Sequence, residues 1–154
     1  MAIARDSGRV GVLVVDDHVG IRIGVASLID AEQPRLYCAG TASTSREALL
    51  RTRELQPQVV LLDVNLDGED GLALIPALHD AAPCTVVVLT CLSDPHVAVH
   101  ALRQGAKACL HKTAPAADLI AAIVAAQSGS DRDIPGLPLI TGSGLSHATG
   151  TNNP

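Results

Sequence analysis

Five polar side chains follow four short apolar runs, and their types suit the binding of divalent cations and phosphoryl groups. Asp16 and Asp17 follow one run, and Asp63, Thr90 and Lys112 each follow another. Short β-branched runs without alternation are typical of parallel strands buried on both faces. Because the carboxyl ends of such strands open onto one crevice, we expect the five side chains to converge.

Three carboxylates in one crevice repel one another when ionised, so the cluster favours a bound cation. Mg²⁺ is the predicted ion because it is hard and prefers oxygen ligands. Asp16 and Asp17 alone could cap a helix, but that interpretation leaves Asp63, Thr90 and Lys112 unexplained. With a phosphoryl group present, Asp63 is the expected nucleophile, which forms an acyl phosphate. Lys112 and Thr90 are expected to contact phosphoryl oxygens.

Five expected strands alternate with five expected helices, which predicts a doubly wound parallel sheet. Thr44 and Glu47 form a capping box that starts one helix, Gly105 ends another, and Thr113 is expected to cap the last. We expect helices at 19–29, 44–55, 72–81, 95–103 and 116–127, strands before each of them including 35–39, and a loop at 66–71.

The composition limits the partners of this chain. Aromatic residues make up 1% of 154 residues, so a base-stacking surface for single-stranded nucleic acid is not expected. The net charge of -5 argues against binding to a phosphate backbone. Residues 1–9 lack the apolar segment of a signal peptide, and no run is long enough to span a membrane. We therefore expect a cytoplasmic protein that binds neither nucleic acid by itself nor a membrane.

The order and spacing of Asp16-Asp17, Asp63, Thr90 and Lys112 resemble the receiver domain of two-component response regulators. The resemblance covers residues 9–129 and implies a flavodoxin-like α/β fold, with a five-stranded parallel sheet of order 2-1-3-4-5 and helices on both faces. Residues 130–154 are rich in Gly, Pro, Ser, Thr and Asn, which indicates a flexible tail or linker.

Two further strings resemble one subfamily of receivers, which usually carries a C-terminal LuxR-type helix-turn-helix. These are residues 14–18 with Arg22 and Gly24, and residues 101–106 before the last strand. No helix-turn-helix pattern follows in this chain. The resemblance therefore leaves three roles open: a stand-alone receiver, a phosphorelay shuttle, or a receiver truncated before a DNA-binding domain.

The resemblance also implies the ligands of the metal. Asp17 and Asp63 would bind Mg²⁺ directly, and Asp16 directly or through water. Asn65 would supply its backbone carbonyl, with its side chain near the phosphoryl group. All of these ligands are oxygens, so His18 and His111, which flank the site, are not expected to bind the ion.

The phosphoryl chemistry follows from the same resemblance. Asp63 would accept the group from a sensor histidine kinase or a phosphotransfer protein, and Lys112 would hold a phosphoryl oxygen. Thr90 would turn toward the phosphate and bias an equilibrium between inactive and active states. The output would be a surface over residues 92–127, the last two helices and strand, where a partner or a second copy binds. Such a chain is a signalling switch that turns over no external substrate.

Three residues depart from the family pattern. Cys109 stands where an aromatic ring usually follows the threonine, Cys91 where a very small residue is common, and Asp67 where proline is frequent. The four cysteines show no metal-ligand spacing, and we expect reduced thiols. A redox switch formed by Cys91 and Cys109, in which oxidation blocks phosphorylation, is an additional hypothesis.

Two other functions compete with the phosphorelay switch. A phosphohydrolase with an aspartyl nucleophile usually places two aspartates two residues apart after its first strand, whereas Asp16 and Asp17 are adjacent. A degenerate receiver would bind its partner whether or not it is phosphorylated. Cys109 favours the degenerate receiver, and the intact acidic set argues against it.

Overall fold

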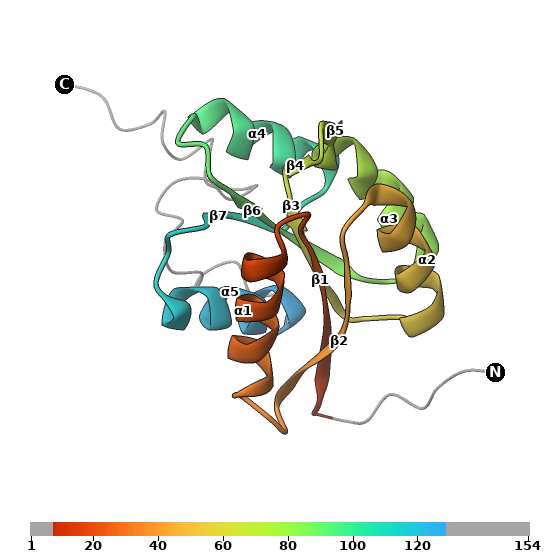
Figure 1. The fold of residues 1–154 in the computed structure, drawn as a ribbon, viewed down its shortest axis with the longest axis vertical. Helices are drawn as coiled ribbons and strands as arrows, with labels where there is room; N and C mark the ends of the chain where they lie inside the picture. The colour runs from red at the N-terminus through yellow and green to blue at the C-terminus, as the bar shows by residue number, and fades with distance from the viewer. Residues whose placement is uncertain (1–7, 129–154) are drawn as a thin grey trace.

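Five parallel strands form the sheet that the sequence predicts (Figure 1). The computed structural model describes residues 8–128. When only the five strands of this sheet are numbered along the chain, their order is 2-1-3-4-5, which confirms the flavodoxin-like topology. From one edge to the other the strands are β2 (Leu36–Ala42), β1 (Val10–Val15), β3 (Val59–Asp63), β6 (Thr85–Thr90) and β7 (Ala108–His111).

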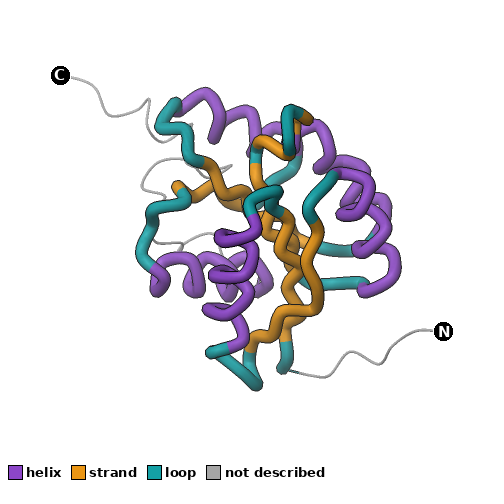
Figure 2. The backbone as a smooth tube through the Cα atoms, viewed as in Figure 1, coloured by secondary structure: helices purple, strands orange, loops and turns teal. Residues whose placement is uncertain are grey.

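Helices cover both faces of this sheet, as Figure 2 shows. One face carries α1 (Val19–Asp30) and α5 (Ala116–Ser128). The other carries α2 (Ser45–Leu55), α3 (Ile75–Ala81) and α4 (Pro95–Gln104). A 3₁₀ helix, η1 (Gly71–Leu74), leads into α3, and an antiparallel pair, β4 (Asn65–Leu66) and β5 (Glu69–Asp70), follows β3.

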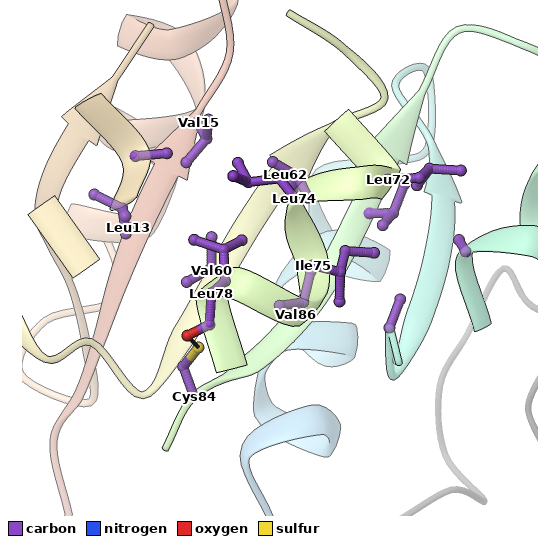
Figure 3. Close-up of a cluster of buried hydrophobic side chains, with 14 of the residues drawn as sticks. Leu13, Val15, Val60, Leu62, Leu72, Leu74, Ile75, Leu78, Cys84 and Val86 are labelled. Carbon is purple, nitrogen blue, oxygen red and sulfur yellow. Dashed lines mark hydrogen bonds between the residues drawn. The ribbon is translucent and has the colours of Figure 1, made fainter. Parts of the chain in front are cut away.

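The central strands β1 and β3 are buried on both faces, which explains their continuous hydrophobic runs. In β1, Leu13 and Val15 pack on the side of α2, α3 and α4, whereas Val12 and Val14 pack on the side of α1 and α5. Figure 3 shows the first of these two clusters, in which Ile75 of α3 lies over the sheet. A strand covered on both sides has no polar face, so alternation is lost.

Local signals set the start of α2 and the end of α4 as predicted. Thr44 Oγ1 accepts a hydrogen bond from the Glu47 amide at 3.0 Å, and Glu47 Oε1 accepts one from the Ser43 amide at 2.7 Å. The first bond satisfies an amide in the first turn of α2 that has no helical partner, and the second ties the residue before the cap to the helix. Gly105 ends α4 with φ of 113°, a left-handed conformation that favours glycine.

The predicted loop at 66–71 is wrong in part, because it contains a tight hairpin. Asp67 and Gly68 have φ of 52° and 87°, and they connect Asn65–Leu66 to Glu69–Asp70. Asp-Gly is the preferred sequence for a two-residue turn with two positive φ values, so the signal was present in the chain. The expected helix at 72–81 likewise begins as the 3₁₀ helix η1.

Two other expectations need correction. The second strand runs to Ala42 and not Ala39, because β1 continues to pair with it as far as Val15. Thr113 contacts His111 through its Oγ1, 2.7 Å from Nδ1, and α5 begins only at Ala116. The predicted tail at 130–154 lies outside the described residues. Among residues 8–128 no helix has the length and apolar character needed to cross a membrane.

Candidate functional site

The carboxyl ends of four neighbouring strands bring the predicted side chains to one edge of the sheet. Asp63 ends β3 one residue after Leu62, which pairs with Val15, so Asp63 lies level with Asp16 after β1. On the other side, Thr90 ends β6, and its carbonyl accepts a hydrogen bond from the Lys112 amide at 2.8 Å. Parallel register therefore places these residues together, because equal positions on parallel strands lie side by side.

Lys112 makes the closest charged contacts of the site. Its Nζ lies 2.7 Å from Asp16 Oδ2 and 3.0 Å from Asp63 Oδ2. The Lys112 side chain is only 7% exposed, and both carboxylates are buried. An ion pair removed from water is poorly screened, so it acts strongly on the charge states of its members.

This arrangement shifts the pKa values of Asp16, Asp63 and Lys112 in different directions. Burial raises the pKa of Asp63, and the nearby charge of Asp16 raises it further, against the hydrogen bond from Lys112. For Asp16, burial also acts to raise the pKa, but hydrogen bonds from Lys112 and from the His18 amide outweigh it and lower the pKa. Burial acts to lower the pKa of Lys112, whereas its bonds to Asp16 and Asp63 raise it overall. Lys112 is therefore a permanent cation at neutral pH.

The oxygen atoms of this cluster fit a divalent cation. Asp17 Oδ1 is buried and accepts no hydrogen bond, although His18 Nδ1 lies 3.0 Å away. One ligand atom from each of Asp16, Asp17, Asp63 and His18 can be chosen so that all four lie within 4.8 Å of one another. A buried carboxylate oxygen without a donor is costly, and a cation would supply the missing interaction.

The β4–β5 hairpin lies against this acidic cluster. Asp17 Oδ2 accepts a hydrogen bond from the Asp67 amide at 2.9 Å. Asn65 donates from its amide to Asp63 Oδ1 at 3.4 Å, while its side-chain oxygen accepts a bond from the Gly68 amide at 2.9 Å. The Asn65 side chain thus supports the turn. That its backbone carbonyl binds the metal stays a prediction.

Arg22 and His18 also contact the site, which the sequence did not predict. Arg22 Nη1 donates to the Asp16 carbonyl at 2.8 Å and so ties α1 to the end of β1. His18 Nδ1 lies 3.2 Å from Asp16 Oδ1 and 3.0 Å from Asp17 Oδ1. His111 differs, because its two ring nitrogens contact Thr113 Oγ1 and the Cys91 carbonyl. Adjacency in the chain was the only available signal for His18.

Thr90 and Cys109 occupy the two positions predicted to form the switch. Thr90 Oγ1 accepts a hydrogen bond from the Leu92 amide at 2.9 Å. Cys109 is 6% exposed, and burial raises its pKa to about 11. Cys109 pairs with Val88 on β6, two residues before Thr90, and alternation places all three on the same face of the sheet.

The structure argues against a disulfide between Cys91 and Cys109. Cys91 is exposed, Cys109 is buried, and both thiols are free. Cys91 lies three residues beyond Val88, the partner of Cys109. At the usual rise along a strand this offset is roughly 10 Å, beyond the Cα separation of about 7 Å that a disulfide can bridge. Oxidation of this pair would require the backbone to move.

Comparisons with known proteins identify relatives of this chain. A family model described as response regulator receiver domain matches residues 12–124. The transcriptional regulatory protein LiaR of Bacillus subtilis (strain 168) is 33% identical over 122 residues, which are 79% of this chain and 57% of LiaR. The chain spans about half the length of the curated relatives it matches.

Solved structures agree in fold. The signal receiver domain of the putative response regulator NarL from Mycobacterium tuberculosis has 28% identity and a TM-score of 0.73, covering 79% of this chain and 98% of that one. A response regulator protein from Burkholderia pseudomallei, solved with a phosphorylated aspartic acid, a calcium ion and citrate, has 27% identity and a TM-score of 0.68. That match covers 77% of this chain and 69% of the other.

Proposed function

Since the chain belongs to the response regulator receiver domain family, we propose that Asp63 accepts a phosphoryl group from a sensor histidine kinase or a phosphotransfer protein. The buried contact of 3.0 Å between Lys112 Nζ and Asp63 Oδ2 carries this proposal. It holds a fixed cation beside the carboxylate, where charge on a transferring phosphoryl group needs stabilisation.

The transfer is a displacement at phosphorus. A carboxylate oxygen of Asp63 attacks the phosphorus atom and forms the acyl phosphate. The P–N bond of the kinase phosphohistidine breaks, and the imidazole nitrogen keeps the electron pair. Lys112 then exchanges its contact with Asp63 Oδ2 for one with a phosphoryl oxygen, while Asp16 continues to hold Nζ at 2.7 Å.

We assign Mg²⁺ to Asp16, Asp17, Asp63 and the backbone carbonyl of Asn65. When bound, the ion supplies positive charge that offsets the carboxylates and the phosphoryl oxygens. The buried Asp17 Oδ1, which accepts no hydrogen bond, supports this assignment. The related protein from Burkholderia pseudomallei, with its phosphorylated aspartic acid and calcium ion, provides a precedent for such chemistry in the fold.

The proposed output begins at Thr90. Thr90 Oγ1 accepts a hydrogen bond from the Leu92 amide, so a turn of the Thr90 side chain toward a phosphoryl oxygen would change this contact. Leu92 is the first residue of the surface over residues 92–127. Leu92 is 54% exposed and is free to change its packing. We propose that this surface binds a partner or a second copy. Cys109 cannot fill and vacate a pocket as an aromatic ring does, so Thr90 would carry the signal without it.

We propose that the chain acts as a cytoplasmic signalling switch and turns over no external substrate. Because LiaR is named a transcriptional regulatory protein and is longer than the segment matched, a parent protein of this kind would send its output to a DNA-binding half. A docking module that ignores phosphorylation is the second candidate, and the small side chain of Cys109 is the observation that favours it. Partner binding by wild type and Asp63→Ala distinguishes the two.

Intact mass after incubation with Mg²⁺ and acetyl phosphate tests the proposal. We expect one phosphoryl adduct on the wild type, and none on Asp63→Ala or in EDTA. Asp80→Ala is the matched control, because Asp80 is an exposed aspartate on α3, and it should form the adduct. An adduct that persists in Asp63→Ala would refute Asp63 as the acceptor. Failure of the folded wild type with both acetyl phosphate and a phosphorylated kinase would favour the docking module.

A further inference from the structure

His18 adds a nitrogen atom to the predicted all-oxygen cation site. Its Nδ1 lies 3.2 Å from Asp16 Oδ1 and 3.0 Å from Asp17 Oδ1, and the latter oxygen is the buried atom that lacks a hydrogen bond. The same ring nitrogen belongs to the group of ligand atoms that lie within 4.8 Å of one another. The imidazole therefore shares its neighbours with any ion held by these carboxylates.

The spacing of these atoms suits ligands on one metal ion. When metal–ligand bonds are about 2.1 Å long, neighbouring ligands of an octahedral ion lie about 3.0 Å apart. Both distances from the His18 nitrogen to the aspartate oxygens are close to this value. The ring now hydrogen-bonds Asp16 Oδ1. To bind an ion, Nδ1 would be deprotonated, with the ring proton on Nε2 or released to solvent.

We infer that His18 makes this a mixed oxygen and nitrogen site, which prefers first-row transition-metal dications over Mg²⁺. Imidazole is a good ligand for Ni²⁺, Cu²⁺ and Zn²⁺, whereas Mg²⁺ keeps to oxygen ligands. The carboxylates bind either class of ion, and His18 adds a bond only for the second. This inference rests on the proposed function, because it uses the same carboxylates that would bind Mg²⁺.

The fold does not depend on the His18 ring. The side chain is 65% exposed. His18 stands at the N-cap position of α1 but makes no side-chain capping bond there. Its backbone amide, which donates to Asp16 Oδ1 at 2.8 Å, is retained in any substitution except proline. His18→Gln therefore removes the imidazole nitrogen while leaving the local backbone contacts in place.

Calorimetric titration of the untagged full chain with Mg²⁺ and with Ni²⁺ tests the inference. His96 and His100 lie four residues apart on α4 and offer a second place for Ni²⁺. Ni²⁺ titrations are therefore repeated in saturating Mg²⁺, and the event that Mg²⁺ displaces identifies the acidic site. We expect His18→Gln to weaken this event tenfold or more, to change Mg²⁺ affinity less than threefold, and to shift the ligand-field bands of bound Ni²⁺.

His100→Gln is the matched control, and it should change only the binding event that Mg²⁺ does not displace. Unchanged Ni²⁺ affinity at the acidic site in His18→Gln would overturn the inference and leave the Mg²⁺ site intact. Equal losses for Ni²⁺ and Mg²⁺ would also overturn it, because they would make His18 a positioning residue for the aspartates. A wild type that binds neither ion would refute the metal site of the proposed function itself.

Discussion

Replacing Lys112 with methionine tests whether its ammonium balances the buried carboxylates. The ammonium lies 2.7 Å from Asp16 Oδ2 and 3.0 Å from Asp63 Oδ2, and all three side chains are at most 7% exposed. Breaking a buried ion pair by removing one partner costs about 3–5 kcal/mol. We take about 3 kcal/mol as the expected loss for Lys112→Met at pH 7.5 without metal, because the carboxylates can partly protonate.

Urea unfolding followed by circular dichroism measures this loss, since the chain has no Trp. With an m value of about 2 kcal/mol/M, the midpoint should fall by about 1.5 M. Arg51→Met is the matched control, because Arg51 is an exposed cation in the middle of α2. A surface substitution of this kind should change stability by less than about 0.5 kcal/mol.

The pH dependence of the loss provides a stricter test. In the wild type the pKa of Asp16 is lowered, so its stabilising contribution is present above the unfolded value of 3.8 and is lost as the pH falls through the folded value. Burial already raises the pKa of Asp63 in the folded wild type. Its protonation therefore stabilises the folded state at low pH, and this stabilisation is lost as the pH rises through the folded value. Without Lys112 both pKa values should be raised, so lowering the pH stabilises the variant relative to the wild type.

The difference between Lys112→Met and wild type should therefore shrink from pH 7.5 to pH 5. Mg²⁺ should restore more stability to the variant, because the ion takes over part of the role of the ammonium. A loss below about 1 kcal/mol at pH 7.5 would refute the buried ion pair as the source of stability, given the penalty expected for such pairs. A loss that does not change with pH would show that lost packing of the Lys112 stem accounts for it.

Two further predictions concern the backbone behind Asp63 and the thiols. Gly71→Ala should destabilise by about 2 kcal/mol or more, because its Cβ would lie 2.1 Å from the Asp63 carbonyl oxygen. Gly20→Ala, which meets nothing within 4 Å in α1, should not destabilise in the same urea unfolding measurement, and equal losses would refute the steric reason. In Ellman assays at pH 8, Cys109 should react far more slowly than exposed Cys91, since its pKa of about 11 leaves about one thiolate in a thousand. The rate of the Cys109 reaction should rise about tenfold per pH unit up to about pH 11. If a fast phase at pH 8 remained in Cys91→Ala and disappeared in Cys109→Ala, Cys109 would be the reactive thiol and the prediction would be wrong.

Local sequence already determined the start of α2, the end of α4 and the strand interiors. The capping bonds of Thr44 and Glu47 and the left-handed Gly105 act within a few residues, so their types announce them. The apolar runs determined the parallel sheet for the same kind of reason, because a strand covered on both faces must be apolar throughout. The hairpin at Asp67-Gly68 was also encoded locally, by the Asp-Gly pair that such a two-residue turn prefers.

Only the tertiary structure decided how far apart the charged atoms of the site lie. Spacing predicted that Asp16, Asp63 and Lys112 would meet, but the order of the strands and their register set the contacts of 2.7 and 3.0 Å. Cys91 and Cys109 follow neighbouring strands, and register separates them. A sequence determines the residues that each strand carries to the edge of a sheet, whereas contacts between strands depend on packing over the whole chain.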